Sequence, residues 1–181
     1  MIQKIILGLI NLVLGSMVLL SYHNGVNSLK AAGKDPNILW GGVPAILQPM
    51  IVVFMFLGAL GYFFFTYNFL FNVSTDQLFF KRFSYWSLHL LYLLVFIPSM
   101  LWIGQTIKYI DTGTMVDWAL VVTMLLTVAM ASIFLFLFTI DLRVEKNTFM
   151  YLASVIGAAV FTFHTLFLDG LIWISFFHKT N

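Results

Sequence analysis

The chain has 181 residues, of which 61% are hydrophobic and 9% charged, and its mean hydropathy is +0.99. Soluble globular proteins average about 45–50% apolar and about 25% charged residues, so a water-soluble fold of this length could not bury the excess of apolar side chains. We therefore predict an integral, multi-pass membrane protein in contact with the lipid bilayer, and the small net charge of +2 gives no reason to expect a nucleic acid partner.

Five apolar stretches are long enough to cross a bilayer, which takes about 20 residues. They lie near 5–22, 43–70, 86–105, 118–140 and 149–177. Because backbone polar groups in lipid must be satisfied within their own segment, each stretch is expected to be a helix. The sequence thus predicts an all-α fold with one domain over residues 1–181, a bundle of five transmembrane helices joined by short loops.

Three local features refine the predicted helices. The first stretch has a basic residue, Lys4, before an apolar run, which is the pattern of a secretory signal peptide. No cleavage site of small residues comes after the run, so we predict a helix that is retained. The second stretch begins GGVPAILQP, and its two prolines predict a turn over 41–49 before the spanning helix starts. Pro98 predicts a kink in the third helix.

Five crossings place the two termini on opposite sides of the membrane. On this topology the side of the N-terminus carries Lys4, Lys81, Arg82, Arg143 and Lys146, and the other side carries Lys30, Lys34, Lys108 and Lys179. The small excess of basic residues on the first side predicts a cytoplasmic N-terminus. Trp102 and Trp118 fall near the opposite boundary, where an aromatic belt is expected.

Asp169 is the most unusual residue of the last stretch, which reads FHTLFLDGLIW over 163–173. If that helix ends near Phe177, Asp169 lies about 12 Å inside the membrane boundary. An ionised carboxylate at the centre of a membrane helix costs about 2.5–3.5 kcal/mol on insertion scales, so the chain must pair, neutralise or hydrate it. The alternatives are a functional acid and a structural carboxyl that is hydrogen-bonded to a neighbouring helix.

Residues at a similar depth could join Asp169 in a polar site. Ser99 and Thr123 lie at similar distances from the same membrane boundary, and Gln48 joins them if the 41–49 turn dips inward. The predicted ligand or proton site therefore consists of Asp169, His164, Gln48, Ser99 and Thr123.

Three sharper chemistries based on histidine are disfavoured. On an α-helix His164 and Asp169 point about 140° apart, so we expect no direct pair between them. That divergence, and the lack of further matching sequence blocks, argues against a glycerolipid acyltransferase, which has the same His-x-x-x-x-Asp spacing. His89 and His164 are offset in depth by about 12–15 Å, which disfavours a bis-histidine haem.

An interfacial metal site is the third chemistry. Its residues would be His23, His178, Asp111 and Asp117. No ligand spacing such as HExxH supports a metal there, so no cofactor is assigned.

The function we favour is that of a non-enzymatic polytopic membrane protein whose polar site binds or passes a proton, a cation or a small ligand. One alternative is an accessory or assembly subunit of a larger membrane complex, in which the apolar surface contacts other membrane proteins or further copies of this chain. A second alternative is a membrane-embedded enzyme linked to lipid, quinone or haem. The sequence does not identify the membrane.

Overall fold

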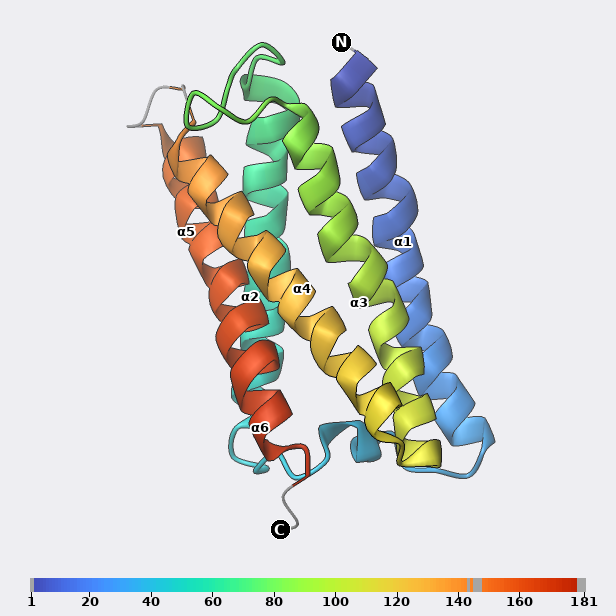
Figure 1. Ribbon diagram of the computed structural model, residues 1–181. Helices are drawn as coiled ribbons and strands as arrows, with labels where there is room; N and C mark the ends of the chain where they lie inside the picture. The colour runs from blue at the N-terminus through green and yellow to red at the C-terminus, as the bar shows by residue number, and fades with distance from the viewer. Residues whose placement is uncertain (1, 143, 145–147, 179–181) are drawn as a thin grey trace.

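The computed structural model describes all residues except 1, 143, 145–147 and 179–181, and it forms a bundle of long helices (Figure 1). The elements in chain order are α1 (Ile2–Ala31), η1 (Pro36–Trp40), α2 (Gln48–Tyr67), η2 (Asn68–Asn72), α3 (Trp86–Thr112), α4 (Met115–Ile140), α5 (Phe149–Phe163), η3 (His164–Trp173) and α6 (Ile174–Phe176). Within these residues five helical segments are long and apolar enough to span a membrane, which confirms the predicted all-α fold of five helices. The chain is therefore an integral, multi-pass membrane protein.

The two termini lie at opposite ends of the bundle, which we call the N-terminal end and the C-terminal end (Figure 1). This arrangement follows from an odd number of crossings. A cytoplasmic N-terminus stays a prediction, because the fold alone does not distinguish the two sides of a membrane.

Several helices extend beyond the apolar stretches from which their spans were predicted. Helix α1 continues to Ala31, and α3 continues to Thr112. Helix α3 ends only at Gly113, whose left-handed φ of 63° closes the helix while its N–H donates to the carbonyl of Tyr109. Polar side chains do not stop a helix by themselves, so the change in polarity marked the membrane boundary rather than the end of the helix.

The two predictions that rested on proline have different outcomes. Residues 41–47 form turns, and α2 begins at Gln48 with Pro49 in its first turn, which confirms the predicted turn before the second span. Pro98 lies inside α3, which continues through it to Thr112, and the kink at Pro98 stays a prediction.

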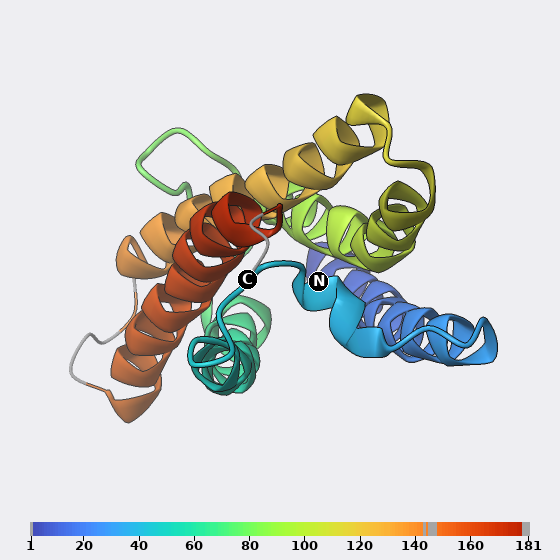
Figure 2. The ribbon, with the colours of Figure 1, turned by 90° about the horizontal axis from the view of Figure 1, so that it is seen from below.

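The helices pack mainly in three pairs. Helix α2 lies along α5, α3 lies along α4, and α1 lies along α3 at the edge of the bundle (Figures 1 and 2). The α2–α5 pair is closest at Gly61 and Gly157, where a Cβ built on Gly61 would lie 2.5 Å from the Cα of Gly157. Close backbone approach at small residues is the usual way in which helices associate in lipid, because apolar side chains gain little there by avoiding lipid.

The buried side chains form two clusters, one at each end of the bundle. The cluster of the N-terminal end includes Phe69, Tyr92 and Ala158, and the cluster of the C-terminal end includes Leu168 and Trp173. The last membrane-spanning segment contributes Ala158 to the first cluster and Leu168 to the second. His164 lies between these two positions, so the candidate site falls at the junction of the two cores.

Candidate functional site

The segment that carries His164 and Asp169 is wound as a π-helix over His164–Trp173, directly after the α-helical turns of α5. A π-helix bonds residue i to residue i+5 and is rare, and short π-helical turns occur frequently at functional sites. Gly170 lies within this segment. A Cβ at Gly170 would meet the carbonyl oxygen of Thr165, five residues earlier, at 3.1 Å, so a glycine relieves the crowding of the wider turn.

The π-helical turn brings His164 and Asp169 together. The Nε2 atom of His164 lies 3.2 Å from Oδ2 of Asp169. The prediction that the two side chains point too far apart to pair is therefore wrong. It assumed 100° per residue, whereas i→i+5 winding returns a residue five positions later to nearly the same face.

The histidine is the buried member of the pair and the carboxylate is the accessible one. The side chain of His164 is 11% exposed and that of Asp169 is 31% exposed. The side chain of His164 begins next to α2, where a Cβ on Gly58 would lie 3.8 Å from the Cβ of His164. Its Nδ1 atom is buried and has no hydrogen-bond partner among the described residues. One partner of the pair thus reaches the surface of the bundle, and the other has a buried nitrogen without a hydrogen-bond partner among the described residues.

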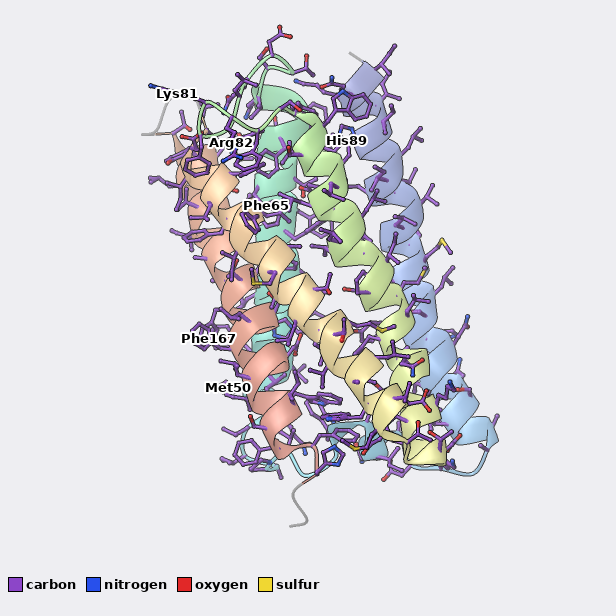
Figure 3. The ribbon with its side chains drawn as sticks, in the orientation of Figure 1. Met50, Phe65, Lys81, Arg82, His89 and Phe167 are labelled. Carbon is purple, nitrogen blue, oxygen red and sulfur yellow. The ribbon has the colours of Figure 1, made fainter. Side chains whose placement is uncertain are left out.

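The next residue, Thr165, faces the opposite neighbour. Its hydroxyl is 2.7 Å from the hydroxyl of Ser132 on α4, and the nearby Thr162 hydroxyl donates to the carbonyl of Ser132 at 3.0 Å. Helix α4 therefore holds one face of η3 while α2 covers His164. Phe167 projects away from the other helices, so its face is the outer one (Figure 3).

Asp169 has aromatic neighbours from two other helices. Its carboxylate acts electrostatically on the hydroxyl of Tyr22 on α1. The Tyr22 ring is 5.7 Å from that of Trp102 on α3, and the Trp102 ring is 5.4 Å from that of Trp173, the last residue of η3. These ring contacts connect α1 and α3 to the end of η3, one turn beyond Asp169.

The same contacts revise the predicted aromatic belt. Trp118 packs on Trp173 at 6.0 Å and on Phe177 at 5.3 Å, and Trp102 also packs on Trp173. These tryptophans lie near the C-terminal end as expected, but they pack against one another as part of the core of that end.

The other three predicted site residues make their contacts elsewhere. Gln48 donates from Nε2 to the carbonyl of Val43 at 3.0 Å, which fastens the turn before α2. Thr123 donates to the carbonyl of Ala119 in its own helix and lines a groove between α3 and α4. Ser99 is half-buried on α3. Among the described residues none of the three forms a hydrogen bond with His164 or Asp169.

A second polar cluster, not foreseen from the sequence, lies next to His164 on the side of the N-terminal end. The hydroxyl of Tyr62 donates to Oδ1 of Asn11, which joins α2 to α1. One turn further along α2, the hydroxyls of Thr66 and Tyr92 are 2.6 Å apart. Tyr62 lies one turn from Gly58, the residue that packs on His164. A lone asparagine within the apolar run of 5–22 was the signal that could have pointed to this cluster.

The two histidines considered for a haem have separate partners. His89 lies near the N-terminal end of the bundle, where its Nε2 atom is 2.8 Å from the carbonyl oxygen of Gln3 (Figure 3). His164 lies 3.2 Å from Asp169 in the last membrane-spanning segment. With its Nε2 engaged by the backbone of α1, His89 contributes nothing to the site around Asp169.

The four residues considered for a metal each have other partners. His23 bonds to Asn27, and His178 bonds to Tyr109. Asp111 forms an ion pair with Lys34, while Asp117 lies 2.8 Å from Nζ of Lys108 and accepts from Gln105, Thr112 and Thr114. No group of three or more His, Asp or Glu side chains suited to a metal is found in the part of the chain that the structure describes.

The pair also removes the geometric objection to a His-x-x-x-x-Asp enzyme. A carboxylate that orients an imidazole is the arrangement of a general base, as in the serine protease triad. The chain still lacks the further sequence blocks of glycerolipid acyltransferases, and this lack is now the one remaining argument against that activity.

Comparisons with known proteins do not assign this chain to a family. No protein-family model matches the chain, and neither the curated proteins nor the solved structures contain a significant match.

Proposed function

We propose that this polytopic membrane protein binds a proton at the His164–Asp169 pair and exchanges it with the aqueous phase on the side of its C-terminal end. The observation that carries the proposal is the 3.2 Å contact between Nε2 of His164 and Oδ2 of Asp169 within a π-helical turn. The proposal sharpens the prediction of a site for a proton, a cation or a small ligand to one exchangeable group.

Physical chemistry of the membrane interior supports this assignment. Ionisable residues inside membrane segments are costly, and when they are kept they mark ion pathways or proton relays. Histidine is the side chain whose ordinary titration falls nearest neutral pH, and its two nitrogens can accept and release a proton at different places. A histidine nitrogen 3.2 Å from a carboxyl oxygen can therefore share one proton with it.

The unequal exposure of the two partners gives the site a direction. Asp169 is the more exposed partner and is the group that exchanges with water, while His164 is nearly buried and its Nδ1 atom faces the bundle interior. Proton transfer further into the bundle would pass from this nitrogen toward the Tyr62 cluster, one turn along α2. Binding at the pair is the core of the proposal, and passage beyond it is the step that completes a transport function.

The experiment is proton flux into vesicles. The purified chain is reconstituted into liposomes that contain a pH-sensitive dye, and a potassium gradient with valinomycin sets the membrane potential. We expect the wild-type chain to acidify the lumen under a driving potential, and D169N and H164Q to reduce the flux to that of protein-free vesicles. The matched control is D111N, which removes the same charge from an exposed ion pair with Lys34.

Binding is measured separately from passage. Infrared difference spectra between acid and neutral pH should contain a carboxylic acid band that disappears in D169N and persists in D111N. Flux in D169N equal to that of the wild type would overturn transport through the pair. If the wild type shows neither the carboxylic acid band nor proton flux above that of protein-free vesicles, the proposed function as a whole is overturned.

A further inference from the structure

A groove with a cavity of about 540 Å³ lies between α3 and α4, on a different part of the bundle from the His164–Asp169 pair. The two helices are joined by a short turn at the C-terminal end and separate toward the N-terminal end (Figure 1). The walls of the groove are almost entirely apolar. Leu90 and Leu94 line one side, and Leu126, Met130 and Phe134 line the other.

The groove is apolar and longer than the hydrocarbon depth of one leaflet, so it has room for one lipid chain. On α4 the lining runs from Thr123 to Phe138, about 22 Å at 1.5 Å per residue. One leaflet of a bilayer has a hydrocarbon depth of about 15 Å. Thr123 and Thr127 also line the groove, and both hydroxyls donate to carbonyls of their own helix, so they present no unsatisfied polar group to an acyl chain.

The mouth of the groove at the N-terminal end is basic. Phe83 and Phe138 close it with rings 5.7 Å apart, and the guanidinium carbon of Arg82 lies 5.6 Å from the centre of the Phe83 ring. Lys81 precedes Arg82 at the tip of the same tight turn, and both side chains are exposed (Figure 3). Neither cation forms an ion pair with the described residues.

The neighbouring acid of this turn is engaged elsewhere. Asp141 accepts a hydrogen bond at Oδ2 from the backbone N–H of Phe80, at 2.5 Å. Lys81 and Arg82, which form no ion pair with the residues that the structure describes, therefore stand at the headgroup level of an apolar groove about 22 Å long. Clusters of basic residues next to a membrane helix attract anionic lipid headgroups.

We propose that the α3–α4 groove binds one acyl chain of an anionic phospholipid whose headgroup contacts Lys81 and Arg82. The apolar walls recognise the chain, and the two cations select the charge of the headgroup. This site is separate from the proposed proton site, and its occupation does not require Asp169 or His164.

The test is lipid binding to the purified chain by native mass spectrometry, with phosphatidylglycerol and phosphatidylcholine of identical acyl chains. We expect the wild type to bind phosphatidylglycerol more tightly. R82Q should weaken phosphatidylglycerol about fivefold, the effect of one basic residue at a membrane surface, and leave phosphatidylcholine unchanged. The matched control is K30Q, which removes an exposed cation at the C-terminal end of α1 and should change neither lipid.

A second variant tests the apolar part of the site. L126W places a larger ring in the groove and should weaken both lipids, with circular dichroism confirming that the bundle is folded. Equal affinity for the two lipids in the wild type, or unchanged phosphatidylglycerol binding in R82Q, would overturn the proposal. A third result would also overturn the proposal. If the wild-type mass spectrum contains a dimer peak that L126W loses while its lipid binding is unaltered, the groove binds a second copy of the chain instead of a lipid.

Discussion

The close crossing of α2 and α5 predicts a strong effect from a single methyl group. In G61A the new Cβ would lie 2.5 Å from both Cα and the carbonyl oxygen of Gly157, and these backbone atoms have no rotamer by which to move away. Carbon atoms pack best about 3.5–4.0 Å apart, so the helices must separate by at least about 1 Å. Forcing extra atoms into a packed site costs about 1–3 kcal/mol.

A matched control isolates this steric cost from the preference of helices for alanine. Replacing glycine by alanine inside a helix contributes about 0.8–1.0 kcal/mol of stability wherever there is room. Gly8 on α1 has that room, because nothing lies within 4 Å of the position that a Cβ would take there. The free energy of unfolding of G8A should therefore exceed that of G61A by about 1–3 kcal/mol, the steric cost alone.

Reversible unfolding in mixed micelles of increasing dodecyl sulfate content, followed by circular dichroism, measures that difference. Both variants should keep the helical signal before the transition. G61A should unfold at a lower fraction of dodecyl sulfate than G8A. Equal midpoints for G61A and G8A would show that Gly61 and Gly157 are not in contact, and the close approach of α2 and α5 would be wrong.

Two hydrogen-bond predictions use the same assay. Asn68, the first residue of η2, donates from Nδ2 to Oγ of Ser154 at 2.6 Å and to the carbonyl of Met150 at 3.1 Å, both on α5. Bonds between membrane helices contribute about 0.6 kcal/mol on average and at most about 1.7, so N68A should lose about 1–3 kcal/mol of unfolding free energy. Wild-type stability in N68A would contradict the contact between η2 and α5. Y62F keeps the ring but leaves Oδ1 of Asn11 without its donor, so it should lose about 0.6–1.7 kcal/mol, and an unchanged midpoint would show that this bond between α1 and α2 contributes nothing.

The fold was predictable because the thickness of a bilayer limits the number of helical solutions. Each of the five apolar runs is long enough to span, and lipid allows an exposed spanning segment of this kind only as a helix. The helix ends were less predictable. Residues 23–31 are too polar for the centre of a membrane, but they contain no strong helix breaker, and α1 continues through them to Ala31.

Two residues of the candidate site, His164 and Asp169, were predictable from the sequence, but their geometry and the other three predicted members were not. Asp169 and His164 are conspicuous in the sequence because charge and imidazole are rare among phenylalanine and leucine. The winding that joins them is not visible as a periodicity, because one π-helical stretch within a long apolar segment changes no hydrophobic pattern. Depth alone selected Ser99 and Thr123, and depth does not fix the direction in which a side chain points around its helix.

The π-helical turn explains how an acid can be kept inside the bundle. With α-helical winding Asp169 would point about 140° from His164 and would need its partner from another helix. Two of the polar groups predicted at a similar depth have other partners, since Gln48 is bonded to Val43 and Thr123 to Ala119. The π-helical winding instead supplies the partner from the same helix, at 3.2 Å. The pair then depends on the local winding rather than on packing between helices, so a loosened bundle such as G61A should keep its proton-binding infrared band even where its stability falls.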